Sequence, residues 1–244
     1  MSVLSKPEIL KHLKAGNISI SPFNLDNVAN SSYDVRLGKY FFRQDPIKHS
    51  QVLNPFYEKS LRRMYSEVEE AVEVSEIKSK LNPFHGLHPK DKVILIAPNE
   101  TILAHTIEFI GGKNGTKDLP VEPAKLCLPA VTTEMRARSS IGRIGIAVCK
   151  CAGWGDIGYV NRWTMEITNF SNVIIPLPVG LRIAQIIFHS TTPVPELDKY
   201  SDKGGKYQTS NDLQTLKKNW KPDDMLPKLY KDKDLGHFSK YAKE

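Results

Sequence analysis

The feature that most constrains the fold of this 244-residue chain is a series of short, apolar runs separated by loops rich in proline, glycine and asparagine. Short strands at this spacing are typical of a β-sandwich, a jelly roll or a closed barrel, and they argue against βαβ units. We therefore predict an all-β fold whose strands include Lys92–Ala97, Thr101–His105, Ile107–Ile110, Cys127–Thr133, Gly145–Cys151, Trp163–Asn169, Val173–Leu177 and Leu181–Phe188.

Three segments that precede or interrupt this series of apolar runs have a different sequence pattern. Residues Lys6–Gly16 have a proline near the start, one apolar face and a final glycine, which together predict a short helix. Tyr33–Gly38 alternates apolar and polar residues and ends in a turn glycine, so a strand is predicted there. Tyr57–Glu76 is charged and weakly periodic, and we expect an inserted helix or a long excursion, within an insertion at about residues 51–90.

The domain organisation is predicted from a change of composition near residue 195. Residues 1–195 are interpreted as a single β domain that carries the insertion. Residues 196–244 are polar and rich in lysine, and we expect them to form a lid followed by a loosely packed tail.

Composition argues against several classes of function. The net charge is +7, but lysine and arginine alternate with acidic residues and no RRM, KH, zinc-finger or basic-zipper pattern occurs, so no nucleic acid is predicted as partner. The same charge would help a small polyanion such as a triphosphate to arrive. No apolar run approaches the roughly 20 residues that span a bilayer, and no secretory signal is evident. We expect no membrane association and a cytoplasmic location, or the host cytoplasm if the protein is viral.

Cysteine and histidine patterns predict no metal site built by the protein. The three cysteines, Cys127, Cys149 and Cys151, are an odd number, which argues against a disulfide framework. Cys149 and Cys151 are expected to share one face of a buried strand. The HxE and PCxxC elements of zinc-dependent nucleobase deaminases are absent, as is a GxxxxGK[ST] phosphate loop.

One carboxylate stands out because strand periodicity gives it a defined setting. On a strand over Trp163–Asn169, Glu166 shares a face with two threonines, while Trp163, Met165 and Ile167 point to the opposite, apolar face. A lone glutamate above short polar side chains suits proton transfer. The alternative interpretation is a solvated glutamate on a surface strand.

Three other segments could contact a nucleotide. Arg138–Arg143 (RSSIGR) places two arginines beside Ser139 and Ser140, which are expected to cap a short helix and to suit phosphate; an unliganded helix cap is the alternative. Ala152–Tyr159 reads as a tight glycine-rich hairpin, a plain structural turn being the alternative. Lys206–Gln208 could fold over phosphates as a lid, or belong to a disordered tail.

Five motifs in order resemble the dCTP deaminase branch of the dUTPase superfamily, from about residue 6 to residue 208. They are Ser31–Gly38 (SxDxRLG), Arg138–Gly145 (RSSxxRxG), Cys151–Tyr159 (TAGFIDPGF), Thr164–Asn169 (TLExxN) and Pro178–Phe188 (xxGxxIGQxxF). The resemblance implies a distorted β-barrel or jelly roll of the dUTPase-like type with short helices. It also implies a homotrimer with sites between subunits, and hydrolytic deamination of dCTP without zinc.

The resemblance also assigns roles by position. Glu166 would be the general base that activates water for attack on cytosine C4, an effect typically worth about 10²–10⁴-fold. The residues that would complete the catalytic set are Ser139, Arg143 and the carbonyl of Ala152. The substrate-binding residues would be Arg138, Ser140, Lys206 and Tyr207 on the triphosphate with Mg²⁺, Asp156 on the deoxyribose 3′-hydroxyl, Gly158 and Tyr159 in the hairpin, and Gln185 for base recognition.

The presence of both Glu166 and Asp156 favours the dUMP-forming members, which also release pyrophosphate. The hairpin has Ile157 where the family has proline, and Thr209-Ser210 replaces the end of the usual KYQGQ tail. Two alternatives stay open: a dUTP pyrophosphatase only, and an inactive nucleotide-binding regulatory protein of the same fold.

Overall fold

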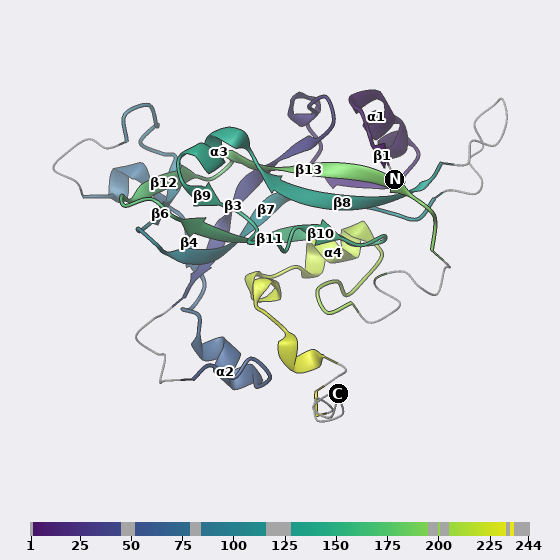
Figure 1. Cartoon of the computed structure of the whole chain (residues 1–244). Helices are drawn as coiled ribbons and strands as arrows, with labels where there is room; N and C mark the ends of the chain where they lie inside the picture. Colours follow the sequence, from purple (N-terminus) through teal and green to yellow (C-terminus); the bar gives the residue numbers. More distant parts are fainter. Residues whose placement is uncertain are drawn as a thin grey trace.

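A computed structural model describes residues 2–44, 52–78, 84–115, 128–194, 200, 205–232 and 235–236. The predicted all-β fold is confirmed: every paired strand is antiparallel, and the sheets curl around one apolar core, with short helices at the margins (Figure 1). The larger sheet has the order β10-β8-β13-β3-β7-β11-β9, with β1 on β13, β2 on β7 and β4 on β3. The smaller sheet has the order β12-β6-β5.

The larger sheet contains β1 (Ser2–Val3), β2 (Ile18–Ser21), β3 (Tyr33–Arg43), β4 (Glu69–Glu70), β7 (Thr101–Gly112), β8 (Ala130–Ala137), β9 (Ile146–Ala147), β10 (Trp154–Gly155), β11 (Val160–Asn169) and β13 (Arg182–Thr191). The smaller contains β5 (Val72–Glu73), β6 (Lys92–Ile96) and β12 (Ile175–Pro178). The α-helices are α1 (Lys6–Lys14), α2 (Glu58–Arg63), α3 (Ser139–Arg143) and α4 (Leu213–Asn219). The 3₁₀ turns are η1 (Leu25–Asn27), η3 (Val74–Glu76), η5 (Pro222–Met225) and η6 (Leu229–Lys231).

The core lies between the curled faces and is built from the apolar alternate residues of the long strands. Fully buried members from four strands are Val35, Leu37, Ile102, Ala104, Met165, Ile167, Ile186 and Phe188. Each large side chain buried in this way stabilises the fold by about 1.5–3 kcal/mol. None of the described helices is long and apolar enough to cross a membrane.

Several predicted elements differ from those observed. The helix at Lys6–Gly16 is confirmed as α1, and the two runs between residues 101 and 110 join into the single strand β7. The predicted strand Gly145–Cys151 is wrong, because only Ile146–Ala147 pairs. Lys150 and Cys151 then take left-handed backbone conformations (φ 30° and 71°), which turn the chain away from the sheet. Cys149 is half-buried and Cys151 exposed, while Cys127 lies outside the described residues.

The insertion is helical only in part. Of the segment Tyr57–Glu76, residues Glu58–Arg63 form α2, and the rest forms the short strands β4 and β5 followed by η3. Strand β4 extends the main sheet by pairing Glu70 with Tyr40 of β3, so this half of the insertion belongs to the fold. Helix α2 lies beside the chain that follows α4 (Figure 1), and its Arg62 guanidinium is 5.5 Å from the centre of the Phe42 ring in β3.

The prediction of a loosely packed tail is wrong for residues 205–232. The Asp212 carboxylate caps α4 by accepting from the Thr215 N–H at 2.7 Å. The Trp220 ring then lies 4.7 Å from the His105 ring, and Met225 is 3% exposed in a small apolar cluster with Phe42, Tyr65 and Leu103. The tail therefore packs on β3 and β7 and on the insertion.

Candidate active site

Glu166 is presented by the middle of β11, next to Leu103 of β7. The predicted alternation is observed: Trp163, Met165 and Ile167 are buried in the core, whereas Glu166 is half-buried on the other face. A β-bulge between Arg162 and Thr164 precedes it. Because the apolar face is held in the core, the strand cannot rotate, and the carboxylate is kept at the opposite face.

A cavity of about 380 Å³ lies against this face of β11. Such a volume is within the range of small-molecule sites. Five residues selected from the sequence line it: Ala152, Asp156, Tyr159, Glu166 and Tyr207. The remaining wall is largely aromatic and apolar: Tyr65, Leu103, Trp154, Trp163, Thr164, Tyr200, Met225 and Pro227.

The Glu166 carboxylate has an unusual electrostatic setting. Among the described residues, its Oε2 atom is buried and has no hydrogen-bond partner. Burial raises the pKa of Glu166 above its ordinary value, and a backbone hydrogen bond and the Lys150 charge oppose this only in part. An unpaired buried acceptor costs about 1–3 kcal/mol. The site therefore favours a water molecule or a polar substrate group against Oε2, and it makes the carboxylate a stronger base.

The turn Asp156–Tyr159 forms one end of the cavity. The Tyr159 N–H donates to the Asp156 carbonyl oxygen at 3.0 Å, and Gly158 has φ +92°, a conformation that glycine adopts at little cost. The prediction of a hairpin is wrong here, because β10 pairs with β8 whereas β11 pairs with β7. The segment thus crosses between two parts of the curled sheet. The Tyr159 ring packs edge-on against Trp163 at 5.5 Å.

Gln208 holds this turn in place, and sequence reasoning did not select it as a site residue. Its side chain is buried, with Nε2 donating to the Gly158 carbonyl at 2.9 Å and Oε1 accepting from the Val160 N–H at 2.7 Å. Asn161 Nδ2 donates to the Tyr207 carbonyl at 2.7 Å. The chain after residue 205 is therefore anchored beside the cavity, and Tyr207 is directed into its wall. The KYQ motif was the only signal for Gln208.

The Arg138–Arg143 motif is outside the described cavity wall. It forms helix α3, but Arg138 is the N-cap residue and Ser139 and Ser140 are the first helical residues, so the predicted capping by the serines is wrong. Arg138 Nε instead lies 3.2 Å from a carboxylate oxygen of Asp34.

Three further predicted residues, Gly158, Gln185 and Lys206, are also absent from that wall. Gln185 Oε1 accepts from the Ser32 hydroxyl at 3.2 Å, and Lys206 forms an ion pair with Asp232. Within one chain, Glu166 and the Asp156–Tyr159 turn thus lie together at one cavity, whereas the Arg138–Arg143 motif lies outside its wall.

Three lining residues of the cavity come from the insertion and from the chain after α4, which no motif covers. Tyr65 follows α2, and Met225 and Pro227 follow α4. They reach the cavity only because the insertion and the tail pack on each other, which local sequence pattern does not indicate.

Comparison with known proteins identifies the family. Residues 3–116 and 124–191 match the family model described as dCTP deaminase-like. The chain belongs to this family. Membership confirms the family and the enzyme class predicted from the five motifs, and with them dCTP deamination in pyrimidine deoxynucleotide metabolism.

Relatives named "dCTP deaminase, dUMP-forming" match over most of their length. The protein of Dictyoglomus thermophilum is 30% identical over 84% of this chain and 89% of its own, and that of Methanopyrus kandleri is 28% identical over 85% and 91%. Among solved structures, the 2′-deoxycytidine 5′-triphosphate deaminase of Agrobacterium tumefaciens is similar, with 16% identity and a TM-score of 0.48. That alignment covers 83% of this chain and about half (53%) of the other.

Proposed function

We propose that this chain deaminates dCTP at cytosine C4 with Glu166 as the general base, and that the reaction continues to dUMP and pyrophosphate. The observation that supports this role is that Glu166, whose Oε2 atom is buried and unpaired, lines a cavity large enough for a pyrimidine nucleoside. The dUMP-forming outcome is supported by the similarity to relatives named "dCTP deaminase, dUMP-forming" and by Asp156 in the same cavity wall.

In this mechanism Glu166 takes a proton from a water molecule held near the Ala152 carbonyl. The resulting hydroxide attacks C4, and the proton is passed on to the exocyclic amino group, which leaves as ammonia to give a uracil ring. The raised pKa of Glu166 suits both halves of this transfer, because a base whose pKa is nearer to the working pH also returns the proton readily.

The remaining substrate contacts are proposed from the cavity outward. Asp156 would accept a hydrogen bond from the deoxyribose 3′-hydroxyl, with Gly158 and Tyr159 beside the base. The residues proposed for the triphosphate are Arg138, Ser140, Lys206 and Tyr207, with Gln185 supporting base recognition.

Mg²⁺ would be held by the triphosphate oxygens. Among the described residues no group of three His, Cys, Asp or Glu side chains could hold a metal ion. When bound there, the ion neutralises phosphate charge and orients the leaving pyrophosphate.

A homotrimer with intersubunit sites accounts for the position of Arg138–Arg143 away from the cavity in a single chain. In such an assembly Ser139 and Arg143 of a neighbouring subunit would complete each site. Two variants that each lack activity, Glu166→Gln and Arg143→Ala, should then complement each other. Mixed and reassembled at equal amounts, they are expected to recover about a quarter of wild-type activity. Absence of recovery in confirmed mixed oligomers would refute the shared site.

The test of the activity is product analysis. Wild type with dCTP and Mg²⁺ is expected to yield dUMP, pyrophosphate and ammonia, and Glu166→Gln is expected to form them about 10²–10⁴-fold more slowly. Accumulation of dUTP would limit the reaction to deamination. Turnover of dUTP but not of dCTP would establish a pyrophosphatase, and nucleotide binding without any product would establish a regulatory protein.

A further inference from the structure

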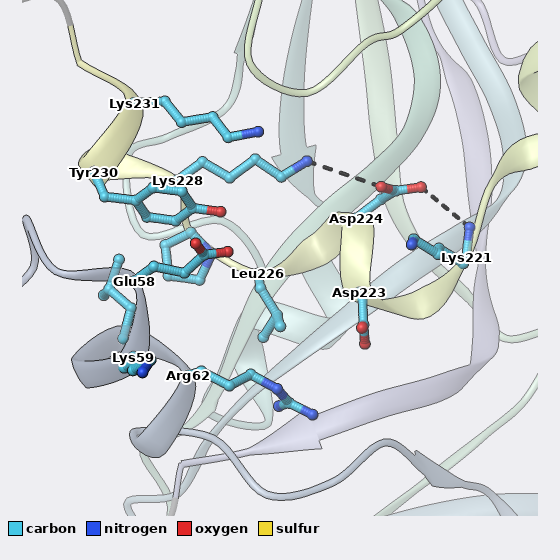
Figure 2. Close-up of a pocket in the computed structure, with 12 residues that line it drawn as sticks. Glu58, Lys59, Arg62, Lys221, Asp223, Asp224, Leu226, Lys228, Tyr230 and Lys231 are labelled. Carbon is cyan, nitrogen blue, oxygen red and sulfur yellow. Dashed lines mark hydrogen bonds and ion pairs between the residues drawn. The ribbon is translucent and has the colours of Figure 1, made fainter.

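A second cavity, of about 500 Å³, lies between helix α2 and the chain after α4 (Figure 2). Its walls come from the insertion and the tail, segments outside the five motifs. Five basic side chains line it: Lys59, Arg62, Lys221, Lys228 and Lys231. Three acidic side chains accompany them: Glu58, Asp223 and Asp224.

The positive charge in this cavity is only partly neutralised from within. Asp224 lies 3.8 Å from Lys228 Nζ, a long ion pair, and its other oxygen accepts from the Lys221 N–H at 3.1 Å. The Lys228 side chain is 14% exposed. Figure 2 shows the Lys228 and Lys231 side chains extending in the same direction from the tail. The Arg62 guanidinium of α2 is already paired with the Glu67 carboxylate at 3.1 Å. The five basic and three acidic side chains that line the cavity leave it with a formal net charge of +2.

We propose that this cavity binds the polyphosphate group of a small molecule, with Lys228 and Lys231 as its principal ligands. Lysine and arginine make charge-assisted hydrogen bonds to phosphate oxygens, and several of them in one concave site select a polyanion over a single charge. The volume exceeds that of a single phosphate and falls within the range of small-molecule sites.

This second cavity shares a wall with the one at Glu166. Pro227 lines both. The Lys228 N–H donates to the Tyr207 hydroxyl at 3.2 Å, and Lys228 Nζ lies 5.3 Å from the centre of the Tyr207 ring. An anion that draws Lys228 away from the ring would shift Tyr207, which lines the Glu166 cavity. Occupancy is therefore expected to change the KM for dCTP, by a factor within the usual range for coupled sites of about 5–150; this consequence alone rests on the proposed function.

Binding is tested by calorimetric titration of inorganic tripolyphosphate and, in parallel, ATP into the full-length protein. Lys228→Ala/Lys231→Ala is expected to weaken tripolyphosphate binding at least tenfold. The control Lys217→Ala/Lys218→Ala removes the same charge from the exposed last turn of α4 and is expected to bind as wild type does. Lys231→Glu alone, at an exposed position, gives the same loss without a risk to folding. If ATP and tripolyphosphate bind with equal affinity, the cavity recognises the phosphates alone. If ATP binds more tightly, the cavity also contacts the nucleoside. Both results support the site.

Three results would overturn the proposal: no binding by wild type, an equal loss in the α4 control, or binding that is lost in Arg138→Ala and kept in Lys228→Ala/Lys231→Ala. The last pattern would place tripolyphosphate at the substrate site instead. The binding test is independent of turnover, so failure of the deaminase proposal and failure of this second site are distinguished.

Discussion

Replacement of Glu166 by glutamine separates the chemistry of the site from its stability. Glutamine keeps the size of the side chain and removes its charge and its ability to accept a proton. Loss of a positioned base is expected to lower kcat by about 10²–10⁴-fold, which corresponds to about 2.7–5.4 kcal/mol of transition-state stabilisation. The assay is ammonia and uracil-nucleotide release from dCTP.

The same substitution is not expected to destabilise the fold at neutral pH, because burial raises the pKa of Glu166. A carboxyl whose pKa is raised by folding is fully stabilising below its unfolded-state pKa, and that stability is lost as the pH rises through the folded-state pKa. Glutamine carries no charge at any pH. Glu166→Gln should therefore have a Tm equal to or above that of wild type at about pH 8, and the two should converge towards about pH 4.

The pH profile gives a third readout. The acid limb of kcat/KM in wild type is expected above the ordinary glutamate pKa of about 4.3, and it should be absent from the residual activity of Glu166→Gln. Undiminished turnover by the variant would refute the assignment of the base. Loss of activity together with a marked fall in Tm would indicate misfolding of the variant. That result would refute the expectation that the substitution changes the chemistry without changing the stability.

Three further substitutions test the surroundings of the site. Gly158→Ala places a side chain at φ +92° and should cost about 1–2 kcal/mol, a fall in Tm of about 2–8 °C, measured by thermal unfolding; an unchanged Tm would contradict the strained turn. Met225→Ala should cost about 2–5 kcal/mol because Met225 is buried between tail and sheet, whereas Lys217→Ala should be neutral; equal Tm values would mean that the tail is undocked. Asp232→Asn releases the ammonium group of Lys206 and should lower the KM for dCTP with kcat unchanged; a raised KM would show that the ion pair helps binding.

Periodic features of the structure were open to prediction because they are local. The two faces of β11 follow from the two-residue repeat of a strand, so the burial of Met165 and the outward position of Glu166 could be inferred from seven residues. The bounds of helix α1 could likewise be predicted, from the proline near its start and the glycine after its end.

Features that depend on backbone exceptions or on distant partners were not open to prediction. The run Gly145–Cys151 has the composition of a strand, and the left-handed residues Lys150 and Cys151 override it. The apolar residues of the tail are isolated among charged residues and do not recur with the period of a helix or a strand. Met225 is buried only because Phe42 and Leu103 of two distant strands leave a place for it.

The sequence by itself therefore determined the all-β class, the ordered motifs of the family and the face on which Glu166 lies, since each depends on neighbouring residues. Tertiary structure alone decided which residues surround that glutamate. It placed Asp156, Tyr207 and the unforeseen Tyr65 around one cavity, and it kept Arg138–Arg143 apart. The physical reason is that the wall of a cavity is formed by segments far apart in the chain. Which residues meet there depends on how the curled sheet, the insertion and the tail pack against one another.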